Sequence, residues 1–316
     1  MALTGLVLAK PRGFCAGVER AIEIVSQALD VFGSPVYVRK EIVHNRHVVE
    51  ALRQKGAVFV EEISEIPPGA TAIFSAHGVA PSVWDAARAK QLHILDATCP
   101  LVTKVHLEVQ RYAAEDYSIV LIGHADHDEV IGTRGEAPDR IQVVDSAEGV
   151  RHLTVPDPQK VVCLTQTTLS MDDTAEIMEA LRKRFPAMTL PAREDICYAT
   201  QNRQRAVKSM AGEVDLVLVI GATNSSNSNR LREVAETAGV RARLIQQVSD
   251  LEPGAFEGVK RVGVTSGAST PEFLVQEVVA HCRRLGVEQV QDLVVTEEHV
   301  KFMLPAELTG ANQESP

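Results

Sequence analysis

Short apolar runs alternate with segments of helical periodicity along almost the whole chain. The runs are rich in Val, Ile and Leu and are apolar at nearly every position, which is typical of strands buried on both faces of a sheet. They predict strands at Leu6–Ala9, Val36–Val38, Ala72–Ala76, Ile94–Ala97, Ser118–Ile122, Val161–Thr165, Leu216–Ile220 and Arg261–Thr265.

Between these runs, apolar residues recur three or four positions apart, which is the spacing of one face of a helix. The two clearest examples are Val18, Ala21, Ile22, Val25 and Leu29, and then Val102, Val105, Val109 and Tyr112. Strands that alternate with helices predict an α/β fold with largely parallel sheets.

Three cysteines occupy equivalent places in this alternation. Cys15, Cys99 and Cys197 each end an extended segment and precede a segment predicted to be helical. Pro100 would take the first helical position, which proline tolerates well. The segment after Cys197 is polar as far as Arg205, so its helix is predicted mainly from its place in the repeat.

The distances from each cysteine to the following polar loops also repeat. The first loop follows after 29, 28 and 28 residues, at His44, His127 and Ser225, and the second after 62, 68 and 72, at His77, Thr167 and Ser269. Ligands of open α/β sheets collect beyond the carboxyl ends of the strands. The spacing therefore predicts three similar α/β units in a pseudo-threefold trefoil around a central cavity. The predicted units are residues 17–98, 99–194, and 1–16 with 195–285, followed by a C-terminal tail at 286–316.

Composition and charge remove several classes of function. The formal net charge of −10 argues against nucleic-acid binding, which needs a basic face. No segment approaches the length of a membrane span, and the short apolar N-terminal run lacks the basic start of a secretion signal. We therefore expect no nucleic-acid or membrane partner and a cytoplasmic location. Composition suggests disorder only in the last residues, Gly310 to Pro316.

The five cysteines divide into two groups. An odd number in a chain without a secretion signal argues against a disulfide framework. Cys163 lies in an apolar run and Cys282 on a late helix, so both are predicted to be core residues. The other three come from separate units and would suit either zinc with a fourth ligand or a cuboidal iron–sulfur cluster. A helix dipole behind each of them would favour the thiolate.

The polar loops offer many hydrogen-bond donors. His44, His77 and His127 follow predicted strands, and a run of Asn and Ser residues spans 224–229. Such groups are suited to an anion, and a helix that begins near Ser228 would add its dipole. The same run would also serve as a plain loop or helix cap.

One carboxylate and two hydroxyls could carry protons. Glu129 follows His127 by two residues in a predicted loop, where it is either a solvated charge or, beside a cluster and an anion, a proton donor with a raised pKa. Thr167 and Thr168 could relay protons or hold a substrate hydroxyl.

Seven motifs in this order resemble those of the 4-hydroxy-3-methylbut-2-enyl diphosphate reductase family, from about Leu6 to about Leu285. They are PRGFCAGV at 11–18, VHNR at 43–46, FSAHGV at 74–79, DATCPLV at 96–102, TQTTLS at 165–170, DICYAT at 195–200 and NSSNSNR at 224–230. The resemblance implies a three-lobed α/β trefoil and the reductive dehydroxylation of a small allylic diphosphate, which is the last step of the non-mevalonate isoprenoid pathway.

The resemblance also implies the roles of the site residues. Cys15, Cys99 and Cys197 match the ligands of one [4Fe–4S] cluster, which would become [3Fe–4S] on damage. Glu129 matches the proton source and Thr167 the residue near the substrate hydroxyl. The positions that match substrate binding are His44, His77, His127, Thr168, Ser225, Ser226, Asn227 and Ser269.

Other classes of protein remain open from the residues alone. An iron–sulfur redox sensor would need a partner surface that the sequence does not show, and a structural zinc protein would hold one zinc. A dinucleotide-dependent dehydrogenase is disfavoured because no GxGxxG follows the first strand. Electrons are therefore expected from a separate carrier protein, ferredoxin or flavodoxin.

Overall fold

The computed structural model describes residues 3–309 and divides the chain into two compact units. Unit 1 takes in the N-terminal residues as far as Cys15, His44–His47 and Tyr198–Val300. Unit 2 takes in Ala16–Val43, Val48–Cys197 and the C-terminal residues from Lys301. Both units are built from helices and parallel strands, which confirms the predicted α/β class.

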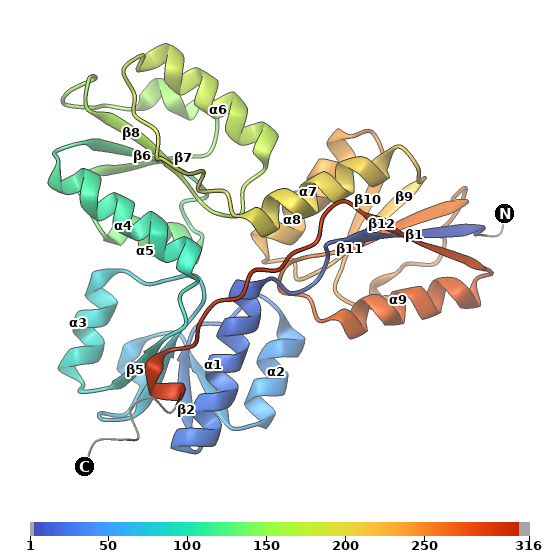
Figure 1. Ribbon diagram of the computed structural model, residues 1–316, viewed down its shortest axis with the longest axis horizontal. Helices are drawn as coiled ribbons and strands as arrows, with labels where there is room; N and C mark the ends of the chain where they lie inside the picture. Colours follow the sequence, from blue (N-terminus) through green and yellow to red (C-terminus); the bar gives the residue numbers. More distant parts are fainter. Residues whose placement is uncertain (1–2, 310–316) are drawn as a thin grey trace. The chain divides into compact units, whose positions relative to one another are not determined.

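Unit 1 contains one five-stranded parallel sheet in the order β10-β9-β11-β1-β12 (Figure 1). Its elements are β1 (Gly5–Lys10), α7 (Tyr198–Ala211), β9 (Leu216–Ile220), α8 (Ser226–Thr237), β10 (Arg241–Ile245), β11 (Arg261–Ser266), α9 (Glu272–Arg284) and β12 (Gln289–Val294). The first strand of the chain thus lies between two strands from its C-terminal third.

Both faces of this sheet are covered, which explains why its strand β9 is apolar at every position. Val217 and Val219 of β9 pack with α7 and α8 on one face. Leu216, Leu218 and Ile220 of the same strand pack with α9 on the other face. Successive side chains of a strand point to opposite faces, so a doubly covered strand needs apolar residues throughout.

Unit 2 contains two parallel sheets, in the orders β3-β2-β4-β5 and β7-β6-β8. The elements of the first are α1 (Ala16–Phe32), β2 (Val36–Arg39), α2 (Arg46–Gln54, whose first residues fall in unit 1), β3 (Ala57–Val60), β4 (Thr71–Phe74), α3 (Pro81–Ala89) and β5 (His93–Asp96). The elements of the second are α4 (Pro100–Ala114), β6 (Ser118–Ile122), α5 (Asp128–Gly135), β7 (Ile141–Val144), β8 (Val161–Thr165) and α6 (Met171–Arg184).

Each of the eight predicted strands exists, three of them with the predicted bounds, namely β6, β8 and β9. The apolar pattern missed β3, β7, β10 and β12, all of which are edge strands. An edge strand is partly exposed, as the burial of β10 and β12 shows, so its sequence is not continuously apolar.

The three-unit division and the trefoil arrangement stay predictions. The structure describes the predicted tail at 286–316 only as far as residue 309. This part contains β12. The expected disorder at Gly310 to Pro316 lies outside the described residues. No helix within residues 3–309 has the length and apolar character that a bilayer crossing requires.

Candidate functional site

Each of the three repeated cysteines stands directly before a helix, as the sequence predicted. Cys15 precedes α1, Cys99 is the N-cap of α4 with Pro100 at its first position, and Cys197 precedes α7. All three are partly exposed, and none forms a disulfide within residues 3–309. A thiol at a helix N-terminus is electrostatically favoured to ionise, and a thiolate is the form that binds metal.

The other two cysteines differ in a way that removes them as ligands. Cys163 is 1% exposed and Cys282 0% exposed, which confirms both as core residues. Burial raises the pKa of Cys163 strongly and the pKa of Cys282 to about 11. A thiol that resists ionisation is a poor metal ligand.

Backbone hydrogen bonds fix the loops that carry the three candidate ligands. In unit 1 the Cys15 amide donates to Ala268 O at 3.2 Å. In unit 2 the Cys99 amide donates to Ala76 O and the Cys197 amide to Thr167 O, both at 3.0 Å. Each cysteine is thus held against a loop that follows a strand. The three carbonyls belong to Thr167 itself and to the chain neighbours of Ser269 and His77.

Glu129 and Thr167 form a buried pair in unit 2. The Thr167 amide donates to Glu129 Oε1 at 2.6 Å, and Thr167 Oγ1 donates to Glu129 Oε2 at 2.9 Å. Glu129 lies in the first turn of α5 and is 3% exposed, which differs from the predicted loop position. Burial raises the pKa of Glu129 to about 7, against the opposing effect of the two hydrogen bonds from Thr167. A carboxyl group with this pKa exchanges protons readily near neutral pH.

Two of the predicted histidines pack against each other at the start of α5. His127 is the N-cap of α5, and its Nδ1 accepts the Glu129 amide at 3.1 Å, which leaves Nε2 to carry the ring proton. Its ring packs edge-on against that of His77, with centroids 5.8 Å apart. The two imidazoles therefore present adjacent polar edges within unit 2. Thr168, one residue beyond Thr167, accepts a hydrogen bond from Gln166 Nε2 at 3.0 Å.

The remaining predicted donors lie together in unit 1. Ser269 Oγ donates to His44 O at 3.0 Å, and Asn224 Nδ2 lies 3.3 Å from His44 Nδ1. Ser225 is the N-cap of α8, where it accepts the Ser228 amide at 3.3 Å. Because α8 begins at Ser226 rather than near Ser228, Ser226 and Asn227 form its first turn, where amide groups point toward an anion.

The side-chain amide of Asn227 is suited to bind a ligand. Its side chain is buried, and among residues 3–309 neither its Nδ2 nor its Oδ1 has a hydrogen-bond partner. Such a buried amide costs free energy unless a further group satisfies it. Its place in the first turn of α8 indicates an anionic or hydroxyl-bearing ligand.

The structure also contains features that the sequence patterns did not predict. His106 of α4 is buried and lies 2.8 Å from Glu136 Oε1. Burial raises the pKa of Glu136, but hydrogen bonds from His106 and Gln110 outweigh that effect and leave the pKa lowered. Nothing local in the sequence indicates this pair, because its members are 30 residues apart.

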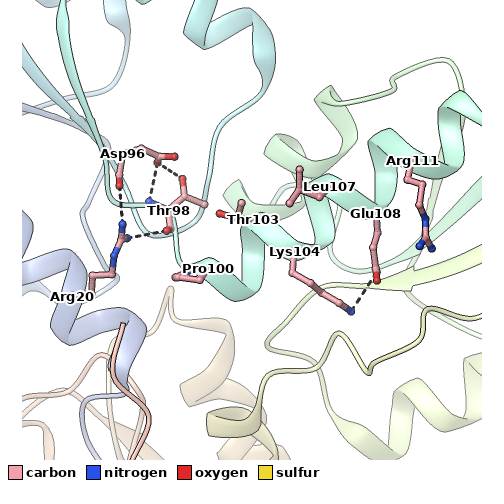
Figure 2. Close-up of a pocket in the computed structure, with 9 residues that line it drawn as sticks. All are labelled: Arg20, Asp96, Thr98, Pro100, Thr103, Lys104, Leu107, Glu108 and Arg111. Atoms are coloured by element: carbon pink, nitrogen blue, oxygen red, sulfur yellow. Dashed lines mark hydrogen bonds and ion pairs between the residues drawn. The ribbon is translucent and has the colours of Figure 1, made fainter. Parts of the chain in front are cut away.

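Figure 2 shows a groove of about 490 Å³ on unit 2, near Cys99. Its lining comes from α1, the turn after β5, and α4, and consists of Arg20, Asp96, Thr98, Pro100, Thr103, Lys104, Leu107, Glu108 and Arg111. Within the described residues, this lining includes none of the predicted site residues, although Thr98 and Pro100 are the neighbours of Cys99 in the chain.

The chain has clear relatives among known proteins. The family model described as LytB protein matches residues 6–283. The chain is 57% identical to the 4-hydroxy-3-methylbut-2-enyl diphosphate reductase of Mycolicibacterium paratuberculosis over 97% of this chain and 92% of that protein. It is also 57% identical to the enzyme of the same name from Aromatoleum aromaticum, over 96% of this chain and 97% of that protein.

A solved structure matches over almost its whole length. It is that of the E-1-hydroxy-2-methyl-but-2-enyl-4-diphosphate reductase from Plasmodium falciparum, with a TM-score of 0.95, 40% identity and coverage of 99% of both chains.

Proposed function

The chain belongs to the LytB protein family, and from this premise we propose that it reduces (E)-4-hydroxy-3-methylbut-2-enyl diphosphate to isopentenyl and dimethylallyl diphosphate. The names of its relatives support this substrate. In the reaction, two electrons and two protons are consumed, a C–O bond breaks, a C–H bond forms and water leaves. The observation that carries the proposal is the buried Glu129–Thr167 pair, because the pKa of about 7 of its carboxyl group suits a proton donor.

Membership of this family implies an iron–sulfur cofactor. We propose one [4Fe–4S] cluster with Cys15, Cys99 and Cys197 as its ligands. The donor set fits, because these three thiols are partly exposed at helix starts while the other two cysteines are buried. When bound, such a cluster supplies one-electron transfers and a Lewis-acidic iron.

The leaving hydroxyl group needs a proton, and Glu129 is suited to supply it. With its pKa near 7, a large fraction of Glu129 is protonated at neutral pH. The Thr167 hydroxyl, in direct hydrogen bond with that carboxyl group, would pass the proton on and orient the substrate hydroxyl. The hydrogen bond from the Cys197 amide to Thr167 O supports this role of Thr167. It holds a proposed cluster ligand beside the residue that would relay the proton.

The diphosphate would be bound by neutral donors. We propose that the first turn of α8, with Ser225, Ser226 and Asn227, binds its oxygens, with the α8 dipole adding to the attraction. The unpartnered Asn227 amide supports this role. The other proposed binding residues are His44, His77, His127, Thr168 and Ser269. Hydrogen-bond donors in fixed positions orient the substrate, and this orientation by itself contributes a large part of a rate enhancement.

The electrons would come from a separate carrier protein, ferredoxin or flavodoxin, because the first strand is not followed by a dinucleotide-binding glycine motif. The cytoplasmic location expected from the sequence also stays a prediction.

An anaerobic assay with the allylic diphosphate and a chemical reductant tests the proposal. Glu129→Gln should retain iron and substrate affinity while turnover falls by at least about 100-fold, since a positioned proton donor contributes about 10²–10⁴. Glu176→Gln, an exposed carboxyl group on α6, is the matched control. Turnover of Glu129→Gln at the rate of this control would exclude the assigned role.

Metal analysis tests the cofactor independently. Iron and sulfide near four each per chain are expected, and Cys197→Ser should lose most of both. Cys163→Ser, a cysteine of the core, should keep them. One zinc per chain, or a complete cluster in Cys197→Ser, would contradict the proposed ligand set.

A further inference from the structure

The helices that follow the three cysteines each carry a cation in their second turn. The cations are Arg20, five residues after Cys15; Lys104, five residues after Cys99; and Arg203, six residues after Cys197. Each one binds the segment that leads into a different cysteine, and each of these contacts lies within one unit.

Arg20 binds the segment before Cys99. Its Nη1 donates to Thr98 O at 3.0 Å and its Nη2 to Asp96 O at 3.3 Å, as Figure 2 shows. The turn is closed by Asp96 Oδ1, which accepts from the Thr98 amide at 2.9 Å. Burial lowers the pKa of Arg20, and the charges of Asp96 and Cys99 oppose that change. The guanidinium group thus binds the carbonyl group of the residue directly before Cys99.

Lys104 binds the segment before Cys197. Its Nζ donates to Arg193 O at 2.7 Å and to Asp195 Oδ1 at 2.5 Å. The Asp195 side chain is fully buried, and its other oxygen accepts the Thr165 amide at 2.9 Å. Lys104 Nζ also lies 3.3 Å from Glu108 Oε2, so this one cation pairs with two carboxylates and fixes the path of the segment.

Arg203 binds the segment before Cys15. Its Nη2 donates to Gly13 O at 2.8 Å and to Phe14 O at 3.4 Å. The side chain is 0% exposed, and Glu298 pairs with it at 3.1 Å. Gly13 has a φ of +70°, so the segment takes a conformation that few other residues allow.

The contacts follow one cyclic order along the chain. The helix after Cys15 holds the approach to Cys99, the helix after Cys99 holds the approach to Cys197, and the helix after Cys197 holds the approach to Cys15. A single buried cation is readily explained by packing. Here, three cations occupy matching positions, and each contacts residues that lie one to four positions before the next cysteine. This repetition indicates a common function.

We infer that Arg20, Lys104 and Arg203 are positioning residues that orient the three proposed cluster ligands and make reduction of the bound cluster more favourable. This inference rests on the proposed function. The hydrogen bonds fix the peptide groups that lead into each cysteine. Lys104 and Arg203 also offset the negative charges of their carboxylate partners, and Arg20 adds a positive charge, so all three favour the extra negative charge that arrives with an electron.

Charge-removing variants test the inference on the cluster-loaded protein. Arg20→Met and Lys104→Met are the main variants, Lys104→Arg preserves the charge, and Arg205→Met on the exposed side of α7 is the control. The measurements are the midpoint potential from an anaerobic titration followed by electron paramagnetic resonance, and the rate of iron loss to a chelator. Circular dichroism verifies the fold of each variant.

We expect each Met variant to make one-electron reduction about tenfold less favourable, which is about 59 mV toward lower potential. Iron loss should be several-fold faster, and Lys104→Arg should recover most of the potential. Potentials and iron-loss rates equal to those of Arg205→Met would overturn the inference. Since Arg203 is fully buried, Arg203→Met is an auxiliary variant, and the other two decide the result if it fails to fold.

The outcome for the unmodified protein separates the two proposals. If it holds no iron and does not reduce the allylic diphosphate, the proposed function fails. If the unmodified protein holds iron and reduces the allylic diphosphate, but the charge-removing variants match the control, only the role of the three cations fails.

Discussion

The pKa of Glu129 predicts how the stability of the protein depends on pH. Burial raises this pKa from 4.5 to about 7, so the folded protein holds the proton more tightly than the unfolded chain does. Below the unfolded pKa the carboxyl group is protonated in both states. Between about pH 4.5 and pH 7 the unfolded chain releases this proton while the folded protein retains it, so stability falls as the pH rises and the loss is complete once the pH has passed through about 7.

The size of the effect follows from the two pKa values. One pH unit is worth 1.36 kcal/mol, so the change from 4.5 to about 7 corresponds to about 3 kcal/mol at pH 8. Glu129→Gln removes the ionisation and retains an amide that can accept the Thr167 amide hydrogen. Because a small part of the effect is already present at pH 5, the variant should gain about 2.5 kcal/mol in unfolding free energy, relative to the unmodified protein, between pH 5 and pH 8.

Urea unfolding of both proteins at several pH values between 5 and 8, under anaerobic conditions, measures this gain. Glu176→Gln controls for the loss of one negative charge at an exposed position. A difference between Glu129→Gln and the unmodified protein that is the same at pH 5 and pH 8 would show that the carboxyl group is not protonated in the folded state. That result would also remove the physical basis for its role as a proton donor.

Three further predictions concern the site and its support. Ser225→Ala should lower the unfolding free energy by about 1 kcal/mol through loss of the α8 cap and raise the KM for the diphosphate, and an unchanged KM in steady-state assays would contradict diphosphate binding there. Gly221→Ala would place a Cβ 2.1 Å from Ser228 Oγ, so urea unfolding should show a loss of roughly 1–3 kcal/mol, and a neutral result would contradict the tight packing. Cys163→Ala should keep its full iron content in metal analysis, whereas loss of iron would make this buried cysteine a ligand.

The local sequence predicted the strands that are buried on both faces better than the partly exposed edge strand β12. Strands β6, β8 and β9 are apolar at all or nearly all positions because helices cover both of their faces, and their bounds were predicted without error. Strand β12 has exposed positions along most of its length, so no apolar run marked it. Its pairing with β1 depends on residues almost 300 positions away, which no local pattern contains.

The candidate site shows the same division. The repeated placement of Cys15, Cys99 and Cys197 before helices was readable in the sequence, because helix starts have local signals such as Pro100. The raised pKa of Glu129 was not, because it comes from burial and from contact with Thr167, 38 residues away.

By itself, the sequence determined the α/β class, the three helix-starting cysteines and the two cysteines of the core, since apolar periodicity and capping are set by neighbours in the chain. Only the tertiary structure decided which polar groups are buried and what they touch. Burial and long-range hydrogen bonds made Glu129 a near-neutral acid, left the Asn227 amide without a partner among the described residues, and joined each of three cations to the approach of another cysteine. The reason is that solvation and electrostatic energy depend on distances in space, which separation along the chain does not fix.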